Sequence, residues 1–456
     1  MSDRQPSTWT KTIVAAMTSY IDAGSIVAGA AGLVLWTEYL DMSTTQIGLL
    51  NALSANALGA AVGALVGGRI CDLYGRKLVY TYDLLFYMLG MLIVIFSTSY
   101  AMLLTGFIIV GLSVGTDVAA SWTLIAENAP AENRARHCGT AQFMWALGPA
   151  VVLLLSAIVN YCGLGLLGSR LVFAHLAIVA FIVWVMRLRM PESEDWVSNK
   201  EKEKQLIAAG VWQKTSYWDL FTNRANRKGL LLLIGVYTIW GLAAGTMGGL
   251  LPYIYNKAGG VGTTTANLLT ALLFVTSCLA TFFIFMTLAD KYSRRVIYCI
   301  VAFLFVLAWG AFFIPASFTG TTVTLTNVVF TSPDGNIWHP SFTLGVLVLI
   351  GVSILMGINN GSGQQAFYQM WAAEMFPARY RAAAQGFSFF TARFCLAIWL
   401  FIAPIIIGKN AEGMPIVAGI LVTFSMISLL IGTIFCPDTA GKTLEQIEQE
   451  RYGTQR

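Results

Sequence analysis

The chain has 456 residues, of which 57% are hydrophobic and only 11% are charged, with a formal net charge of +5. Soluble domains carry about 25% charged residues, so this chain has too few charges to cover a folded surface in water. The composition excludes a cytosolic enzyme, a disordered protein and a disulfide-stapled secreted module, and it predicts a polytopic membrane protein.

Apolar runs of membrane-spanning length recur along the whole chain. A transmembrane helix needs about 20 mostly apolar residues. Twelve runs qualify: 11–38, 46–68, 78–98, 101–126, 138–161, 169–188, 228–254, 265–288, 296–315, 342–372, 383–408 and 413–436. Strands of transmembrane barrels are only about 10 residues long and alternate in polarity, so we predict an all-α membrane protein with twelve transmembrane helices. The first run is too long for a cleaved signal peptide, and we expect it to be retained.

The positions of Lys and Arg predict the orientation. If both termini are cytoplasmic, all but four of the 28 Lys and Arg residues lie on the cytoplasmic side or in its loops. The exceptions are Arg170, Lys257 and Lys409 outside, and Arg393 within a span. Cytoplasmic loops are enriched in these residues, so we expect both termini to be cytoplasmic.

Cysteine and histidine give little indication of chemistry. The seven cysteines are scattered without a CxxC pair, and the three histidines lie far apart. We therefore interpret the cysteines as small apolar residues and predict no metal site and no cofactor.

The charged motifs occur twice. Asp72 and Arg76 follow the second run, as Asp290 and Arg294 follow the eighth. A second motif, with Glu127, Pro130, Arg134 and Gly139, recurs 247 residues later as Glu374, Pro377, Arg381 and Gly386. The charged segment 189–227 separates the two halves. We predict a six-helix bundle over 1–188, a cytoplasmic linker with short helices over 189–227, a second six-helix bundle over 228–436 and a cytoplasmic tail over 437–456.

These motifs resemble the major facilitator superfamily over essentially the whole chain, and within it the sugar porters. Gly68, Asp72, Gly75, Arg76 and Lys77 are similar to the signature loop of the superfamily. Further segments similar to sugar porter motifs are Pro191-Glu192-Ser193-x-x-Trp196, Trp218-Asp219-Leu220-Phe221, Glu374-Met375-Phe376-Pro377 with Arg381, and Pro437-Asp438-Thr439-x-Gly441-x-x-Leu444-Glu445-x-Ile447-Glu448. The resemblance implies two six-helix pseudo-repeats and a plasma (inner) membrane protein that crosses the membrane many times.

The resemblance also assigns a gating role to charges at the cytoplasmic helix ends. These residues are Asp72, Arg76, Glu127, Arg134, Asp290, Arg294, Glu374 and Arg381. Ion pairs in a partly screened medium could hold an inner gate shut and release it at modest cost. The alternative is that the cations only anchor the topology, although carboxylates at matched positions serve no anchoring purpose.

Three ionisable residues stand deep in predicted spans, where each costs about 2.5–3.5 kcal/mol. Asp22 lies in Tyr20-Ile21-Asp22-Ala23-Gly24-Ser25-Ile26, which is similar to the YDxGxI motif whose Asp carries the proton in proton-coupled porters. The Arg that usually accompanies it is replaced by Phe107, and the same helix carries Asp117. Two carboxylates facing one cavity would repel each other, which favours proton coupling through Asp22 and Asp117. A structural role for Asp22, and substrate contact or packing for Asp117, remain alternatives.

Arg393 is the third deep charge. It could neutralise Asp22 or Asp117, bind a carboxylate or phosphate of the substrate, or extend outward to the membrane surface.

A polar lining is predicted from several spans. Gln142 matches the glutamine that contacts sugar hydroxyls in the family, and Gln364, Gln365 and Tyr368 share one helical face. Amides both donate and accept hydrogen bonds, which suits vicinal hydroxyls, although they could also join helices. The expected substrate-binding residues are Gln142, Trp240, Asn360, Gln364, Gln365, Tyr368, Gln369 and Arg393. The lining departs from the family, because the QQxxGxN motif is absent and Gln369 occupies the position of a Trp that stacks on the sugar.

We expect a secondary active transporter that imports a sugar, polyol or related metabolite by alternating access and couples this to protons. Its partners would be the substrate, the proton and the lipid bilayer, with no nucleic acid, and the protein would be a monomer. One alternative is a symporter of sugar acids or other organic anions. Another is a nutrient sensor that does not transport. A drug antiporter is disfavoured, because Gly148-Pro149 is similar to the antiporter motif of the fifth span but this chain lacks the glycines that accompany it there. An enzyme is disfavoured because no span holds a nucleophile–His pair, metal cluster or phosphate loop.

Overall fold

A computed structural model describes the chain over residues 7–53, 57–190, 192–208, 218–257, 259–261, 263–314, 322–324, 330–331, 337–338, 341–407, 413–437 and 439–453. Pro191, His339, Lys409 and Asp438, as well as the linker residues 209–217, lie outside this range.

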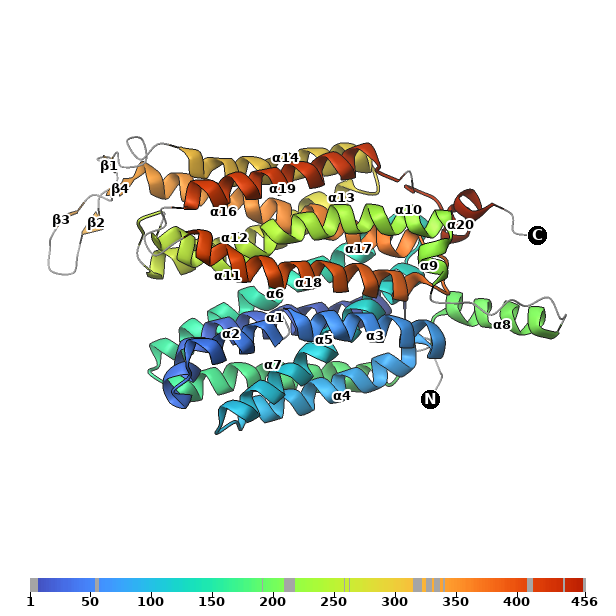
Figure 1. Cartoon of the computed structure of the whole chain (residues 1–456), viewed down its shortest axis with the longest axis horizontal. Coiled ribbons are helices and arrows are strands. Elements are labelled where there is room, and N and C mark those ends of the chain that lie inside the picture. The colour runs from blue at the N-terminus through green and yellow to red at the C-terminus, as the bar shows by residue number, and fades with distance from the viewer. Residues whose placement is uncertain are drawn as a thin grey trace.

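The first half is a bundle of helices that run the length of the molecule (Figure 1). Its helices are α1 (Thr8–Leu40), α2 (Thr44–Leu53), α3 (Leu58–Tyr74), α4 (Arg76–Ile95), α5 (Tyr100–Asn128), α6 (Arg134–Tyr161) and α7 (Gly165–Arg187), with a 3₁₀ turn η1 (Ala131–Asn133) before α6. Ser7 and Ser99 accept hydrogen bonds from the backbone N–H groups of Thr10 and Met102, which satisfies donors left open at the start of α1 and α5.

Short helices connect this bundle to the second half. They are α8 (Glu194–Ala208) and α9 (Asp219–Thr222). The second bundle comprises α10 (Arg224–Leu233), η2 (Ile234–Thr238), α11 (Ile239–Lys257), α12 (Thr263–Ala280), η3 (Thr281–Phe285), α13 (Met286–Leu288), α14 (Arg294–Gly310), η4 (Ala311–Phe313), α16 (Leu344–Ser362), α17 (Gln364–Glu374), α18 (Arg381–Ile407) and α19 (Met414–Ile434). The segments η2 and η3 are π-helical turns inside longer helices, a geometry found often at functional sites.

The two ends of the bundle differ. One end, which we call the terminal end, holds the start of α1 and the short helices α8, α9 and α20 (Leu444–Tyr452) (Figure 1). The opposite end, the loop end, carries two antiparallel strand pairs, β1 (Thr322–Thr324) with β4 (Ser341–Thr343) and β2 (Phe330–Thr331) with β3 (Ile337–Trp338). Within the described residues, these short strands depart from the predicted all-helical architecture.

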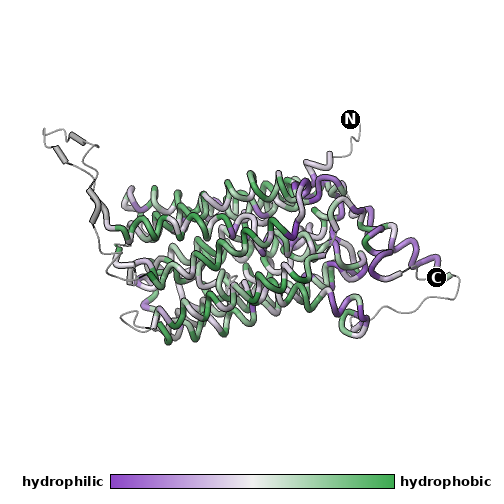
Figure 2. The backbone as a smooth tube through the Cα atoms, turned by 90° about the horizontal axis from the view of Figure 1, so that it is seen from above, coloured by the Kyte–Doolittle hydropathy of each residue, from purple (hydrophilic) through white to green (hydrophobic). Residues whose placement is uncertain are grey.

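Eleven helical segments of the described chain are long and apolar enough to cross a membrane. Hydrophobic residues cover the body of the bundle, whereas hydrophilic residues gather at the terminal end (Figure 2). Helices α2 and α3 occupy the place of the remaining predicted span, 46–68. The protein therefore crosses the membrane many times.

The halves pack against each other most closely where α3 meets α18. A side-chain carbon at Gly68 would collide with the carbonyl group of Ala382, and one at Gly386 would collide with the carbonyl group of Ala64. Both positions therefore need glycine for the backbones to approach. Helix α6 packs similarly against α12 and η3.

Candidate transport site

Glu127, at the terminal end of α5, joins the two halves. Its carboxylate accepts hydrogen bonds from Arg76 of its own half and from Arg381 of the other half, each with a shortest N–O distance of 2.7 Å. The Glu127 side chain is 1% exposed, so both pairs are shielded from solvent. Removal of one partner would leave a buried charge uncompensated.

Glu374 makes the equivalent contacts in the second half. It accepts hydrogen bonds from Arg294 of its own half at 3.0 Å and from Arg134 of the first half at 3.1 Å. Each glutamate therefore binds one arginine from each half, as the repeated motif suggests.

Asp72 and Asp290 complete this pseudo-symmetric arrangement. Asp72 accepts hydrogen bonds from the backbone N–H groups of Ala382 and Ala383, at the start of α18. Asp290 accepts them from Ala135 and Arg136, at the start of α6. Carboxylates are favoured at helix N-termini, where free N–H groups point outward. Each aspartate thereby fastens the end of one half to a helix of the other, although burial raises the pKa of Asp290 against the effect of its hydrogen bonds.

The linker motif packs against the same network. Glu192 accepts hydrogen bonds from the backbone N–H groups of Arg76 and Lys77, and the hydroxyl of Ser193 donates to Glu127. The indole of Trp196 donates to the carbonyl oxygen of Asp72 at 3.0 Å. All eight predicted gating residues thus belong to one closed layer at the terminal end; that this layer works as a gate stays a prediction.

A cavity lies between the halves, on the loop-end side of this layer. It encloses about 790 Å³, part of which is open space, and α1, α6, α11, α12, α16, α17 and α18 contribute to its walls. Its lining residues are Ala23, Ile26, Val27, Trp145, Pro149, Tyr237, Trp240, Gly241, Ala244, Gly245, Met247, Gly248, Phe274, Asn360, Gln365, Ala392, Arg393 and Leu396. A mostly apolar pocket with a few polar groups is typical of a small-molecule site.

Four of the eight predicted substrate-binding residues line this cavity: Trp240, Asn360, Gln365 and Arg393. Asn360 donates to the hydroxyl of Ser277 at 3.0 Å, whereas Nε2 of Gln365 is buried without a partner among the described residues. Gln365 therefore presents a donor that a bound hydroxyl could satisfy.

The other four lie behind the lining. Gln142 donates to the carbonyl oxygen of Asn360 at 2.6 Å and accepts from Gln369 at 3.0 Å. Gln364 accepts from Asn359, which in turn accepts from the indole of Trp240. The structure thus places these amides where they hold the lining residues in position.

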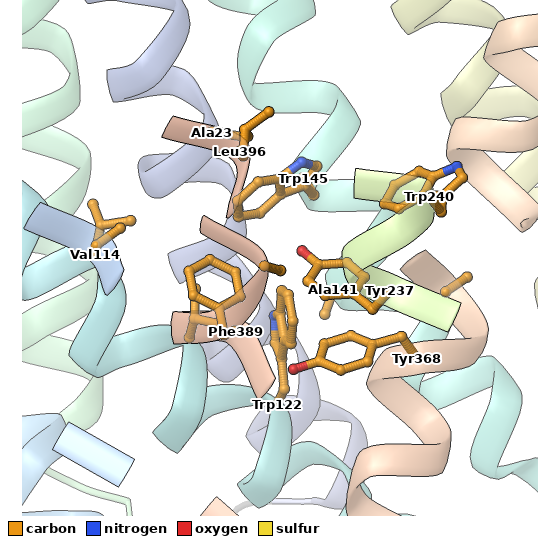
Figure 3. Close-up of a cluster of buried hydrophobic side chains, with 14 of the residues drawn as sticks. Ala23, Val114, Trp122, Ala141, Trp145, Tyr237, Trp240, Tyr368, Phe389 and Leu396 are labelled. Carbon is orange, nitrogen blue, oxygen red and sulfur yellow. The ribbon is translucent and has the colours of Figure 1, made fainter. Parts of the chain in front are cut away.

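An aromatic cluster lies next to the lining residues Trp145 and Trp240 (Figure 3). Tyr368 stacks on Tyr237 with ring centroids 3.9 Å apart. Trp122 packs edge-on against Tyr368 and Phe389, with 6.2 Å between centroids in each pair. We name Trp122, Tyr237, Tyr368 and Phe389 the aromatic plug. Its members come from both halves, so it depends on how the halves meet. Along α18, Phe389 lies between Arg381 of the ion-pair layer and Arg393 of the cavity lining, which places the plug between the two.

Asp22 lies within α1 and is 2% exposed. It directly precedes Ala23, which lines the cavity. Its Oδ2 has no hydrogen-bond partner among the described residues. Asp117, Asp83, Arg187 and Arg393 interact with it electrostatically. Asp117 itself is paired with Arg187 at 3.1 Å.

Sequence reasoning missed Arg187, which it counted among the cytoplasmic cations. Asp83 also lies in a predicted span, so with Asp22 and Asp117 three aspartates face Arg393 alone, and this charge imbalance is the signal for a further buried cation. It also missed Tyr237 and Trp122, because aromatic residues in an apolar helix carry no polarity signal.

Among the described residues no group of three or more His, Cys, Asp or Glu side chains could hold a metal ion. His137 bonds to Thr12 and stacks on Trp9, and His175 bonds to Tyr20. All seven cysteines are free.

Two helical halves around a central cavity, closed at one end by ion pairs, define a transporter of the alternating-access class. The Major Facilitator Superfamily matches residues 12–332. The minor myo-inositol transporter IolF of Bacillus subtilis (strain 168) is 48% identical over 445 residues, which cover 97% of this chain and 94% of that protein. The glucose transporter GlcP of Staphylococcus epidermidis (strain ATCC 12228 / FDA PCI 1200) is 24% identical and covers 93% of this chain and 92% of its own.

A solved structure of the proton:xylose symporter XylE bound to 6-bromo-6-deoxy-D-glucose has the same fold. It superimposes with a TM-score of 0.74 at 19% identity and covers 97% of this chain and 98% of that chain. The chain belongs to the Major Facilitator Superfamily, and its similarity to sugar and polyol transporters confirms the resemblance to the sugar porters. It is a transporter and not an enzyme.

Proposed function

We propose that this transporter imports a polyol or sugar, with a cyclitol such as myo-inositol as the first candidate. The observation that carries this proposal is the buried, unpartnered Nε2 of Gln365 beside Asn360 in a cavity walled by aromatic residues. Amides can donate to and accept from neighbouring hydroxyls, while the faces of Trp145 and Trp240 suit the apolar C–H surface of a ring. The 48% identity to a myo-inositol transporter supports this choice.

Proton coupling would use Asp22. Its unpartnered carboxylate oxygen lies next to the cavity wall, where protonation could accompany substrate binding. Asp117 would assist from the adjoining charge cluster. The two halves would then rock about the site, so that the ion-pair layer at the terminal end opens when the loop end closes.

The proposed arrangement has twelve transmembrane helices, with α2 and α3 supplying the second, in the plasma membrane. The terminal end faces the cytoplasm, since the Lys and Arg residues concentrate there. The units are the bundles 1–188 and 228–436, the linker 189–227 and the tail 437–456. A single chain lines the whole cavity, which favours a monomer, and nucleic acid has no part in this function.

A second candidate is an organic-anion symporter, because Arg393 lines the cavity. A guanidinium binds a substrate carboxylate well. Competition between neutral and carboxylated analogues of one substrate separates the two candidates.

The test is uptake into proteoliposomes of a panel of labelled cyclitols, hexoses, pentoses and sugar acids. We expect saturable uptake of myo-inositol, inhibited by neutral polyols and not by sugar acids. Gln365→Ala should raise the half-saturating concentration about tenfold, which corresponds to the loss of about one hydrogen bond. Asn199→Ala, a matched change on α8, should leave it unchanged. Uptake of sugar acids alone would overturn the proposal.

A further inference from the structure

Three buried charges form a compact cluster inside the first half. Arg187, the last residue of α7, contacts both oxygens of Asp117 at 3.1 and 3.2 Å. It also contacts Asp83 of α4 at 3.4 and 3.5 Å. The three side chains are at most 2% exposed, and the guanidinium lies 4.0 Å from the ring centroid of Tyr80. The cluster is therefore sealed from solvent within the bundle.

The two carboxyl groups of this cluster lie close together, because both contact the guanidinium of Arg187. Two ionised carboxylates at such a site repel each other, and a proton shared between them removes that repulsion. One shared proton makes the cluster of two carboxyls and one guanidinium electrically neutral.

The same proton balances the charge of the whole region. Asp22, Asp83 and Asp117 face Arg187 and Arg393, which leaves one negative charge if every carboxyl is ionised. An unbalanced charge is costly at this depth of a membrane. The other titratable side chains that face these groups are phenols and a thiol, which are neutral when protonated, and one imidazole, which is neutral when only one ring nitrogen carries hydrogen. They are Tyr20, Cys71, Tyr80, Tyr87, His175, Tyr237 and Tyr368. One proton is thus the number that neutralises the region.

The carboxyls are arranged in order of depth. At 1.5 Å per helical residue, Asp83 lies about 10 Å from the terminal end of α4, Asp117 about 16 Å from that of α5 and Asp22 about 21 Å from that of α1. Arg187 is the last residue of α7, and its guanidinium contacts both Asp83 and Asp117. The three carboxyls therefore lead from the substrate cavity toward the terminal end.

We propose that Asp117 and Asp83, positioned by Arg187, are a second proton site that takes the proton from Asp22 and passes it toward the terminal end. This inference rests on the proposed proton coupling through Asp22 and adds the path by which that proton leaves. One proton enters Asp22 from the cavity and moves to the Asp117–Asp83 pair. The proton already shared there departs to the terminal side, so each cycle carries one proton and leaves the cluster unchanged. Arg187 is a positioning residue, since it holds the two carboxyls together without carrying the moving proton.

The shared proton can be observed directly by infrared spectroscopy of the full-length protein in lipid at neutral pH. The wild-type protein should show the carbonyl stretch of a protonated carboxyl, and that band should shift in deuterated water. Asp83→Asn and Asp117→Asn should each remove or displace the band, while Glu203→Gln, at a partly exposed carboxylate on α8, should not. A wild-type spectrum without the band, or a band that both variants leave unchanged, would overturn the proposal.

Transport tests the path. In proteoliposomes with [³H]myo-inositol as the probe, Asp83→Asn and Asp117→Asn should lower accumulation driven by a pH gradient at least about tenfold. Exchange of inositol without a gradient should stay within about twofold, which also shows that the variants fold. Arg187→Lys should keep exchange and shift the pH of half-maximal accumulation.

The outcomes separate this inference from the proposed function. If Asp22→Asn loses accumulation and the two cluster variants keep it, the path is wrong and coupling through Asp22 stands. If Asp22→Asn keeps accumulation, the proposed coupling itself fails. If a variant does not fold, the presence or absence of the protonated-carboxyl band in the wild-type infrared spectrum still tests whether the cluster holds a proton.

Discussion

Arg381 donates a hydrogen bond to Glu127 at 2.7 Å and so joins the start of α18 in one half to the end of α5 in the other. Both side chains are almost fully buried, at 2% and 1% exposure. Asp195 of α8, 39% exposed, contacts the same guanidinium at 3.3 Å, and burial raises the pKa of Asp195. If the terminal end opens as we propose, the link between Arg381 and Glu127 must break, so a change at this ion pair should shift the conformational equilibrium.

Arg381→Ala should shift the protein toward a state open at the terminal end. Removing one partner of a buried ion pair costs about 3–5 kcal/mol, and here it destabilises only the closed state, in which the pair forms. Cys138 is buried in the closed state, so its alkylation by a maleimide should accelerate at least tenfold, or about 1.4 kcal/mol. Lys200→Ala, in a partly exposed ion pair of α8, is the control and should leave the rate unchanged. Equal rates in all three proteins would contradict this role of the ion pair.

Gly386→Val should prevent the terminal end from closing. A side chain at this position collides with the carbonyl group of Ala64 on α3, which is rigid backbone. We expect gradient-driven uptake to fall more than about tenfold while the protein still folds. Gly351→Ala, where nothing lies within 4 Å of an added carbon, should transport normally. Normal uptake by Gly386→Val would show that α3 and α18 need not meet so closely.

Tyr368→Ala should weaken the aromatic plug. It removes a ring that stacks on Tyr237 and leaves a cavity worth about 3–5 kcal/mol. We expect a lower melting temperature and leakage of substrate without a gradient. Tyr368→Phe keeps the ring and loses the hydrogen bond to the carbonyl oxygen of Gln385, so its transport should remain close to that of the wild type. If the two variants behave alike, the hydroxyl and not the ring is what matters.

Asp290 gives the terminal end a pH dependence. Burial raises its pKa above the ordinary carboxyl value, so the folded protein binds this proton more tightly than the unfolded chain. The stabilisation is complete below the unfolded pKa of about 4 and is lost as the pH rises through the raised value. The melting temperature of Asp290→Asn relative to the wild type should therefore increase between pH about 4 and 7. A difference that stays constant or decreases would mean that the hydrogen bonds from Ala135 and Arg136 outweigh burial.

The sequence predicted the fold well because membrane spans are long and uniformly apolar. The expected run 169–188 corresponds to α7, Gly165–Arg187, whereas the run 342–372 is two helices, α16 and α17, that break at Gly363. A break at a glycine does not change hydropathy, so periodicity could not locate it. The β-strand pairs between α14 and α16 are too short to show a pattern.

Some site residues could be predicted from the sequence and others could not. The repeated motifs identified Asp72 and Asp290 as equivalent residues, because equivalent positions in the two halves make equivalent contacts. Arg187 was not recognised as a buried charge, because in the sequence a cation at a helix end is indistinguishable from one that only sets the topology. The structure shows that its side chain is buried against Asp83 and Asp117. The sequence likewise could not separate Gln365, which lines the cavity, from Gln364 next to it, which bonds to Asn359.

Coupling of a polyol to a proton through Asp22 can be tested by recording the pH inside proteoliposomes, with a trapped dye, while myo-inositol is added outside without any imposed gradient. We expect the wild-type protein to acidify the lumen as inositol enters, and Asp22→Asn to transport inositol down its gradient with no pH change. Inositol entry without acidification in the wild type, or acidification by Asp22→Asn, would contradict this coupling.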